Sequence, residues 1–305
     1  MGNTNVAVIV VTYNRLNKLK KALEAYEKQC YLPKYIIIVN NASSDGTTEF
    51  LNTWKEEKSS FKKVVLNLSE NLGGSGGFYE GQKYVLGLDD VQWVMIADDD
   101  AYPEPNYLCG LVEYINENRN ENLSVVCGKV LENGKYVNVH RRFLKTKWQR
   151  IFYYSVPQDY FYKDSFELDF VSYVGVLINI TKLLEVGLVE KDFFIWNDDV
   201  EHSCRLKKVG KLICLPKYEI IHDAEASNFE FSWKDYYGFR NNICIFKRHF
   251  KLQMPLVVLI SVLKAFLCPI KGKSFIESKL RLTAIKDGFL GNLGKHPVYK
   301  PGWKP

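Results

Sequence analysis

The chain has 305 residues, of which 47% are hydrophobic and 25% are charged. This composition is ordinary for a folded globular protein and excludes a disordered chain, a collagen-like chain and a small disulfide-held domain. The net charge of +6 is unevenly distributed, because residues 234–305 carry +11 and the first 233 residues carry −5. A basic tail on an acidic body indicates an anionic partner such as membrane phospholipid, while the absence of a recognition motif argues against nucleic acid.

The cysteines and the first residues bear on cellular location. Seven cysteines form no CxxC pair and are odd in number, which predicts buried free thiols in a reducing compartment. The apolar run at 6–11 is too short for a signal peptide and follows no basic segment. We therefore expect a cytoplasmic protein, with attachment to the inner face of the membrane left open.

Strand and helix patterns alternate through the first hundred residues. Continuous apolar runs typical of buried parallel strands lie at 6–11, 35–39, 63–67 and 92–97. Helical patterns lie between them at 14–28, 47–54 and 78–88. This alternation predicts an α/β fold with a doubly wound parallel sheet, in which ligands bind at the carboxyl ends of the strands.

The remaining elements are expected as follows. A helix is predicted at 107–118, strands at 124–131 and 135–140, and a strand pair or a strand entering a helix at 169–180. The basic and aromatic segment 141–165 is expected to be a loop or a helix. A helix is expected near 198–208, and the segments ICLP and EIIHD close the body. The region from 233 onwards is expected to be helical, so we divide the chain into residues 1–232 and 233–305.

Three consecutive aspartates, Asp98 to Asp100, follow the fourth predicted strand. Neighbouring carboxylates repel one another unless a cation lies among them. Alternate residues of an extended segment share a face, so Asp98 and Asp100 can converge on one ion. A solvated turn is the alternative. His222 ends an apolar strand, where it fits a metal ligand, although a lone histidine is more often structural.

The segment NLGGSGGF, residues 71–78, lies between a strand and a helix. Glycines there allow backbone to approach a phosphate at a helix N-terminus, and close packing of the helix on the sheet is the alternative. The segment is not a P-loop, because no Lys-Ser/Thr pair follows it, and it follows the third strand, unlike a dinucleotide fingerprint.

A second acidic cluster contains Asp198, Asp199 and Glu201. Glu201 lies four residues before Arg205, which predicts an ordinary helical ion pair. The two aspartates are candidates either for capping a helix or for a general base in a cleft.

Six segments in chain order resemble the family 2 glycosyltransferases of the GT-A fold: VVTYNR, IIIVNNASSDGT, NLGGSGGF, WVMIADDDA, FFIWNDDVEHSCRLKKVG and LPKYEIIHD. The resemblance covers about residues 5–225, and YYGFRNN at 236–242 is also similar to a segment of these relatives. NLGGSGGF followed by the three aspartates looks most like bacterial galactofuranosyltransferases and related rhamnosyltransferases. The resemblance implies a GT-A fold, with a Rossmann-like, mostly parallel sheet flanked by helices and a helical C-terminal extension.

The resemblance also implies roles for individual residues. Asp199 matches the catalytic base, with Asp198 beside it, and the metal ligands match Asp98, Asp100 and His222. The positions that match the donor-binding loops are Thr12, Tyr13, Asn14, Arg15, Asn40, Asn41, Asp45, Asn71, Gly73, Gly74, Gly77, Asp98 and Asp99. The family often has Asp where this chain has Asn40, and an amide can pair with uracil or thymine, so the base stays open.

The implied reaction is an inverting, metal-dependent sugar transfer from a nucleotide-diphosphate donor to a glycan or lipid-linked saccharide. Mn²⁺ or Mg²⁺ would neutralise the leaving group. UDP-galactofuranose is the first candidate donor and dTDP-rhamnose the second. A nucleotidyltransferase would prefer a basic glycine loop after the first strand. A non-catalytic carbohydrate-binding or scaffold protein has no need of Asp199 or of the three aspartates.

Residues 252–270 are apolar for about the length of a membrane span, but Pro255, Lys264 and Pro269 interrupt them. Basic residues flank the segment on both sides, which suits a helix lying on an anionic leaflet. The sequence thus predicts a membrane-surface contact through 247–273, with a core helix or a homo-oligomer interface as the alternative.

Overall fold

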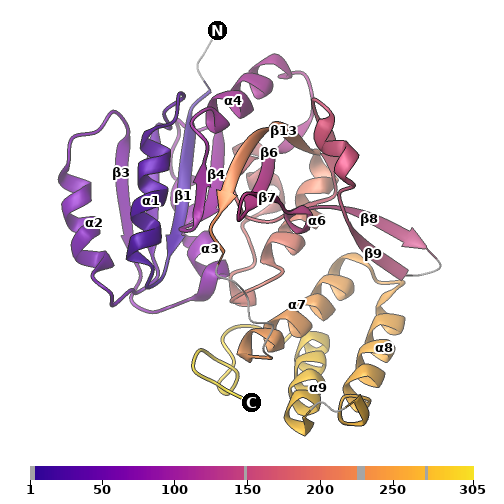
Figure 1. The fold of residues 1–305 in the computed structure, drawn as a ribbon. Coiled ribbons are helices and arrows are strands. Elements are labelled where there is room, and N and C mark those ends of the chain that lie inside the picture. Colours follow the sequence, from indigo (N-terminus) through magenta and orange to yellow (C-terminus); the bar gives the residue numbers. More distant parts are fainter. Residues whose placement is uncertain (1–3, 148–149, 225–230, 272–273) are drawn as a thin grey trace.

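The computed structural model describes residues 4–147, 150–224, 231–271 and 274–305 (Figure 1). A mixed sheet with the strand order β10-β13-β6-β12-β4-β1-β2-β3 forms the centre of the protein. Its first four strands are β1 (Val6–Thr12), β2 (Tyr35–Asn40), β3 (Lys62–Asn67) and β4 (Trp93–Asp98). They pair in parallel, as predicted, so their carboxyl ends meet at one edge.

Helices cover both faces of this parallel half. Alternate residues of β1 pack with α1 (Leu16–Glu27), α2 (Thr47–Glu56) and α4 (Tyr107–Glu117) on one face. The other residues of β1 pack with α3 (Gly73–Val85) on the opposite face. The long apolar runs are therefore buried on both sides, which is why they read as continuous rather than alternating.

The other half of the sheet is mixed. β12 (Val176–Asn179) runs antiparallel to β4 and to β6 (Leu123–Glu132), and β13 (Lys211–His222) runs parallel to β6. The segments ICLP and EIIHD belong to the single strand β13, whose pairing register shifts between Leu215 and Glu219. The short strands that complete the sheet are β5 (Ala101–Pro103), β7 (Lys135–Tyr136) and β10 (Phe166–Leu168).

The expectation of a loop or helix over 141–165 is wrong. β8 (Arg141–Lys147), β9 (Arg150–Ser155) and β11 (Phe170–Val171) form a second, antiparallel sheet. Short 3₁₀ turns precede and follow this hairpin, at η1 (Asn138–His140) and η2 (Gln158–Tyr162). The buried Arg141 guanidinium donates to Gly128 O and Val174 O, both at 2.9 Å. These bonds hold the hairpin against the main sheet.

Helix α3 begins five residues earlier than predicted, inside the glycine-rich segment. A Cβ atom at Gly77 would lie 2.5 Å from Val11 Cγ1, and one at Gly81 would lie 2.6 Å from Ile9 Cγ2. These two glycines therefore let the helix pack closely on β1, which is the structural alternative named for the segment.

The chain then forms α5 (Ile180–Val186), η3 (Lys191–Phe193) and α6 (Asp198–Val209), followed by the C-terminal helices α7 (Trp233–His249), α8 (Met254–Phe266) and α9 (Phe275–Leu290), with η4 (Pro269–Lys271) between the last two. The helical nature of the region after 233 is confirmed. These helices lie below the sheet in Figure 1. In the described ranges, no helix combines the length and the apolar character needed to cross a membrane.

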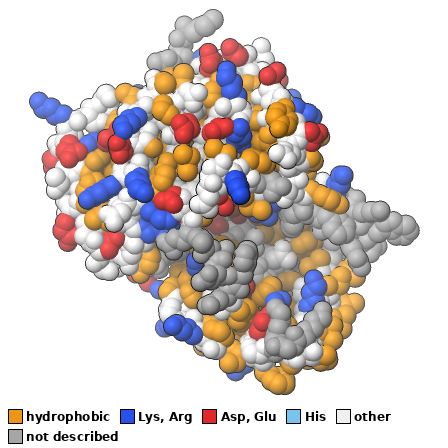
Figure 2. Space-filling view, viewed as in Figure 1, with side chains coloured by type: hydrophobic (Ala, Val, Ile, Leu, Met, Phe, Trp, Pro, Cys, Tyr) orange, Lys and Arg blue, Asp and Glu red, His pale blue; other side chains and the backbone are white. Residues whose placement is uncertain are grey.

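The helices of the tail differ in burial. A capping box at Ser232 and Asp235 starts α7, which buries eight side chains. In α8 only Ala265 is buried. Figure 2 shows hydrophobic side chains, in orange, along the lower right edge of the molecule, where α8 lies in Figure 1. All seven cysteines are free and five are buried, as the sequence predicted.

Candidate functional site

Side-chain bonds join the loops that follow β1 and β2. Asn14 adopts the left-handed region, with φ of 53°, and its Oδ1 accepts from the N–H of Ser44 at 2.7 Å. Asp45 accepts from the N–H of Leu16 at 2.9 Å and from Thr47 Oγ1 at 2.6 Å. Although burial opposes it, these bonds lower the pKa of Asp45. Asp45 thus caps α1 and α2 together.

Asn40 and Asn41 lie at the end of β2 and are almost fully buried. Asn40 Nδ2 donates to Thr48 Oγ1 and to Asn67 Oδ1, both at 2.9 Å. Asn41 Nδ2 donates to Gly73 O at 2.8 Å. Both amides therefore order the neighbouring loops, and contact of Asn40 with a nucleotide base stays a prediction.

The glycines at the start of α3 differ in role. A Cβ atom at Gly73, where φ is 75°, would lie 2.0 Å from Phe194 O, which also accepts from the N–H of Ser75 at 3.2 Å. Asn71 Oδ1 accepts from the N–H of Gly73 at 2.8 Å. A Cβ atom at Gly74 would meet nothing within 4 Å. Gly73 therefore serves contact with the loop before α6, whereas Gly74 leaves the backbone approachable by a ligand.

Residues that follow β1 enclose the aspartates that follow β4. Thr12 Oγ1 donates to Asp99 Oδ2 at 2.7 Å in the interior. Arg15 Nη1 donates to Asp100 Oδ2 at 2.8 Å and lies 3.4 Å from Asp99 Oδ1. Tyr13 between them is 41% exposed. The first predicted donor loop thus lies against the aspartates, and donor contact itself remains a prediction.

The three carboxyl groups differ in ionisation. Burial raises the pKa of Asp98 well above its ordinary value, and the charges of Asp100 and Asp99 raise it further. Burial also raises the pKa of Asp99 to about 6, against the hydrogen bond from Thr12. Burial opposes ionisation of Asp100 as well, but the bond to His222 and its charge lower the pKa of Asp100. A cation near Asp98 would relieve the cost of ionising it.

His222, at the end of β13, lies between two carboxyl groups. Its Nε2 is 3.5 Å from Asp100 Oδ1, and its Nδ1 is 2.7 Å from Glu132 Oε1. His140 Nε2 is 2.9 Å from the same Glu132 oxygen, and His140 Nδ1 is 2.7 Å from Ser172 Oγ. Burial acts to lower the pKa of His222, but Asp100 and Glu132 raise it to about 9. Burial lowers the pKa of His140 to about 4.

These residues fit a divalent metal ion. Ligand atoms of Glu132, His140 and His222 lie within 4.8 Å of one another, but the bonds from Glu132 to the two histidines have hydrogen-bond lengths, too short to enclose an ion. Asp100 Oδ1 is buried, and the group that faces it among the described residues is His222 Nε2, at the ion-pair distance of 3.5 Å. Carboxylate oxygens and a histidine nitrogen are ligand types that Mn²⁺ accepts, and the convergence of Asp98, Asp100 and His222 on one ion stays a prediction.

The loop before α6 is strained and is held by α7. Phe194, Trp196 and Asn197 have φ of 67°, 65° and 66°, and such strain at bulky residues costs about 1–3 kcal/mol each. Asn241 Nδ2 donates to Trp196 O at 2.8 Å, and the buried Arg240 donates to carbonyls just before the strained residues. Both belong to the segment YYGFRNN, so α7 positions the start of α6. The domain boundary after residue 232 stays a prediction.

Asp198 and Asp199 begin α6. Asp198 is buried, and Asp199 is partly exposed and accepts from the N–H of Val200 at 2.7 Å. Burial, and then the charge of Asp199, raises the pKa of Asp198 to about 7. Burial also raises the pKa of Asp199, against the charge of Arg142 on β8. Both carboxylates are therefore more basic than an ordinary aspartate, as proton transfer near neutral pH requires.

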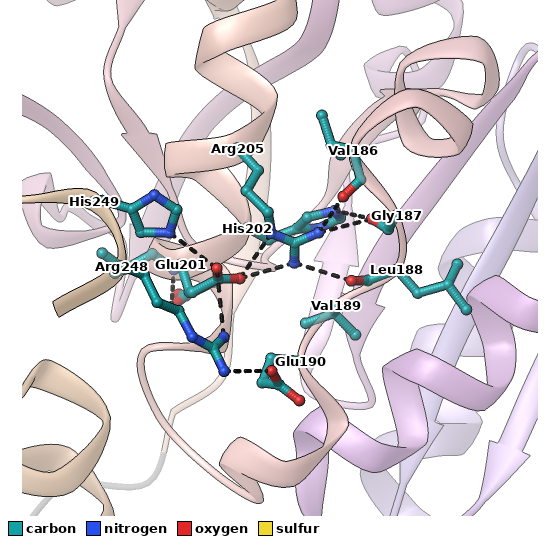
Figure 3. Close-up of polar contacts among 12 residues, drawn as sticks. Val186, Gly187, Leu188, Val189, Glu190, Glu201, His202, Arg205, Arg248 and His249 are labelled. Atoms are coloured by element: carbon teal, nitrogen blue, oxygen red, sulfur yellow. Dashed lines mark hydrogen bonds and ion pairs between the residues drawn. The ribbon is translucent and has the colours of Figure 1, made fainter. Parts of the chain in front are cut away.

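Glu201, one turn further along α6, is surrounded by cations (Figure 3). It accepts from Arg205 Nη2 at 2.8 Å, which confirms the expected helical ion pair, and from His249 Nε2 at 2.9 Å. Arg248 lies 3.7 Å from Glu201 and 2.8 Å from Glu190. Burial opposes ionisation, but His249 and Arg205 lower the pKa of Glu201 to about 2. Glu201 therefore anchors α6 to the end of α7 and is a poor base.

Ser172 and Tyr173 are neighbours in the chain that contact different regions of the site. Ser172 bonds to His140, which belongs to the His222 network. The hydroxyl of Tyr173 bonds to His202 of α6, and burial together with the charge of Asp198 raises the pKa of Tyr173. Two neighbouring residues thus contact the two regions separately: Ser172 bonds to the histidine pair beside the predicted metal residues, and Tyr173 lies within electrostatic reach of the predicted base.

Sequence reasoning missed Glu132, His140 and Arg142. Glu132 and His222 are 90 residues apart, and only the pairing of β6 with β13 brings their strand ends together. The position of Glu132 at the end of an apolar strand was the available signal. Arg142 was obscured by the failure to predict β8.

A family model described as glycosyl transferase family 2 matches residues 7–173. The match spans more than half of the chain, and the chain belongs to this family. It is 35% identical over 98 residues to the galactofuranosyltransferase GlfT1 of Mycolicibacterium smegmatis, covering 32% of this chain and 30% of that protein. It is also 22% identical over 232 residues to the uncharacterised glycosyltransferase RT0329 of Rickettsia typhi, covering 73% and 66%. The alignments with GlfT1 thus span about a third of each protein.

Two solved structures share the fold. GalNAc-T7, crystallised with UDP, GalNAc and Mn²⁺, is similar over 81% of this chain and 48% of the GalNAc-T7 chain, with a TM-score of 0.63 and 14% identity. TarS 1–349 of S. aureus with UDP-GlcNAc matches 80% of this chain and 66% of its own, with a TM-score of 0.55 and 16% identity. These likenesses confirm the predicted GT-A fold.

Proposed function

We propose that the chain is an inverting, metal-dependent glycosyltransferase that moves galactofuranose from UDP-galactofuranose to a hydroxyl of a glycan or lipid-linked saccharide. The observation that carries the proposal is the combination of an anionic Asp100, faced by His222 and Arg15 at the end of β4, with two unusually basic aspartates at the start of α6. Family membership and the likeness to GlfT1 support it.

The first cluster would serve the donor. A bound divalent ion supplies positive charge that stabilises the departing nucleotide diphosphate. Asp98, Asp100 and His222 would hold this ion. Glu132 would accept the proton on His222 Nδ1 and so keep Nε2 directed towards Asp100. Arg15, whose side chain is 38% exposed beside Asp100, would add charge on the side open to the diphosphate.

The second cluster would serve the acceptor. Asp199 takes the proton of the acceptor hydroxyl while the oxygen of that hydroxyl forms a bond to the anomeric carbon. The bond from that carbon to the diphosphate breaks, and the nucleotide leaves with the electron pair, so the configuration inverts. Asp198, whose pKa is raised to about 7, shares a site with Asp199. Because like charges oppose double ionisation, a proton held on Asp198 leaves Asp199 as the carboxylate.

The donor is the least constrained part of the proposal. UDP-galactofuranose is favoured by the similarity to GlfT1. An amide at position 40 would not distinguish uracil from thymine, so dTDP-rhamnose is the second candidate. Residues Gly74 and Tyr13, which are open to solvent, are the nearest candidates for contact with the sugar nucleotide.

A donor screen tests the proposal. Purified protein is incubated with UDP- and dTDP-sugars, Mn²⁺ or Mg²⁺ and a saccharide acceptor, and release of the nucleotide is measured. We expect turnover with UDP-galactofuranose that EDTA abolishes and that Asp199→Asn removes. Exclusive use of dTDP-rhamnose would contradict the assignment of UDP-galactofuranose as the donor. Full activity in EDTA would contradict the proposed dependence on a metal ion. Binding of donors without turnover would favour the non-catalytic alternative.

A further inference from the structure

Helix α8 presents an unpartnered apolar stripe. Leu259, Leu263 and Phe266 follow one another at helical spacing and are 55%, 52% and 62% exposed, and Ile270 in the turn η4 after the helix is 80% exposed. Four apolar side chains, each more than half exposed, exceed the scattered exposure that is normal on a protein surface.

Helix α9 and the turn before α8 extend this stripe. Phe275 in the first turn of α9 is 79% exposed, and Phe289 and Leu290 in its last turn are 50% and 57% exposed. Leu252, just before α8, is 84% exposed. We call these eight residues the outer α8–α9 face; they are Leu252, Leu259, Leu263, Phe266, Ile270, Phe275, Phe289 and Leu290.

The opposite side of α8 is already packed. Ala265 and Cys268 are buried, and Ser278 Oγ of α9 donates to Ala265 O at 2.8 Å. The two helices are thus fixed to one another through their inner sides. The residues of the outer α8–α9 face are half or more exposed, and among them Phe289 has Lys247 Nζ 5.8 Å from its ring centre.

The charges beside this face are positive. Lys251, Lys264 and Lys279 are exposed. The sequence from 247 to 290 contains only two acidic residues. Glu277 is buried and pairs with Arg281 at 2.7 Å, and Asp287 accepts from Tyr236 OH at 2.7 Å. Exposed lysines therefore accompany the apolar stripe. The carboxylates of Glu277 and Asp287 are already bonded within the tail and do not neutralise the lysine charges.

We infer that the outer α8–α9 face rests on an anionic lipid bilayer. Apolar side chains would enter the boundary between headgroups and acyl chains, and the lysines would meet phospholipid phosphates. Helix α8 has 13 residues and is about 20 Å long, shorter than a hydrocarbon core of about 30 Å, so it would lie on the bilayer.

Charge complementarity favours lipid over a second copy of the chain. In a two-fold dimer the same patch faces itself. Two copies of this face would bring their lysines together without an acidic partner, and like charges oppose such contact. An anionic leaflet has the opposite charge and matches the face.

The inference rests on the proposed function in one respect, which is that a lipid-linked acceptor would be confined to the same surface. Helix α7 joins the tail to the loop that precedes Asp199, because Arg240 and Asn241 bind that loop. Docking of the tail would therefore hold the predicted base close to the bilayer.

Vesicle flotation with the full chain tests the inference. The probes are vesicles of phosphatidylcholine alone and of phosphatidylcholine with an equal part of phosphatidylglycerol. We expect binding only to the anionic vesicles, reduced by added salt. The double variant Leu263→Ser and Phe266→Ser should bind the anionic vesicles at least about tenfold more weakly than the unaltered chain. The double variant Lys251→Gln and Lys264→Gln should lose the preference for anionic lipid.

Leu184→Ser is the matched control, because Leu184 is a 63% exposed leucine on α5, outside the face. It should bind vesicles like the unaltered chain, and circular dichroism should confirm that every variant is folded. Equal binding by all variants, or concentration-dependent dimers that the serine variant dissociates, would overturn the inference. Transfer to a soluble acceptor is measured separately, so loss of vesicle binding with intact transfer refutes the lipid contact alone.

Discussion

The two acidic clusters of the site differ in their surroundings. The aspartates after β4 lie within reach of Arg15, Lys18 and His222, at 2.8, 3.7 and 3.5 Å from Asp100. The aspartates at the start of α6 have Arg142 as the cation that lowers the pKa of Asp199, and burial outweighs it. Cations thus hold Asp100 as an anion, whereas burial raises the pKa of Asp98 and Asp99 beside it and of Asp198 and Asp199 in the second cluster.

The proposal places charge binding at Asp100, where cations gather, and proton transfer at the start of α6, where fewer cations oppose the effect of burial. A carboxylate whose pKa is lowered by cations, as for Asp100, is a poor base but a good ligand for a metal ion. A carboxylate whose pKa is raised by burial, as for Asp198 and Asp199, can accept a proton from a hydroxyl. The predictions below test this division.

Asp199→Asn should have the largest effect. The change keeps the shape of the side chain and removes its basicity, so turnover should fall by roughly 10²–10⁴-fold. Binding of UDP should be nearly unchanged, because the donor is assigned to the other cluster. Steady-state kinetics and calorimetry measure the two quantities. Near-normal turnover in this variant, with a loss in Asp198→Asn instead, would move the base to Asp198.

Glu201→Gln should destabilise the protein by about 3 kcal/mol, because it removes the buried negative charge to which His249 and Arg205 are bonded. The pKa of Glu201 in the folded protein is about 2, below its ordinary value of 4.5. The carboxylate therefore stabilises the fold above pH 4.5, and this contribution is lost as the pH falls towards 2. Urea unfolding at several pH values should show the two proteins converging in acid. A constant difference would contradict the assignment.

Glu132→Gln should weaken Mn²⁺ binding by about 10–100-fold, because the hydrogen bond that orients His222 loses its charge. Electron paramagnetic resonance of free Mn²⁺ in the presence of UDP measures this affinity without turnover. Ser172→Ala, which alters the far end of the same network at His140, is the matched control and should change the affinity much less. Equal effects would indicate a structural role for the whole network.

Thr12→Val should have the smallest effect, about 1–2 kcal/mol of stability, because it removes one hydrogen bond to the buried Asp99. The pKa of Asp99, about 6 with the bond, should rise. Nuclear magnetic resonance titration of the carboxyl group measures the shift, and Thr12→Ser should restore it. An unchanged titration would show that this hydroxyl does not act on the cluster.

The parallel half of the sheet was predictable because burial on both faces requires uninterrupted apolar runs, and β1, β2 and β4 have them, whereas the edge strand β3 is only partly buried. The start of α3 was not predictable, because glycine lowers helix propensity. The close approach of Val11 and Ile9 explains why glycines occupy this helix. The hairpin β8–β9 was missed because its basic side chains lack a strand pattern and one of them, Arg141, is bonded to distant carbonyls.

The site was predictable where its residues adjoin strand ends and only partly elsewhere. Asp98, Asp100 and Asp199 stand in acidic runs that local chemistry singles out. The pairing of Glu132 with His222 depends on strand order, which a single sequence does not contain. The hold of Arg240 and Asn241 on the strained loop depends on the docking of α7.

Calorimetric titration of UDP in the presence and absence of Mn²⁺, carried out on the unaltered chain, Asp100→Ala and Asp199→Asn, tests the division of roles most directly. We expect Mn²⁺ to strengthen UDP binding to the unaltered chain and to Asp199→Asn equally, and to have no effect on Asp100→Ala. Loss of the Mn²⁺ effect in Asp199→Asn with its retention in Asp100→Ala would contradict the account.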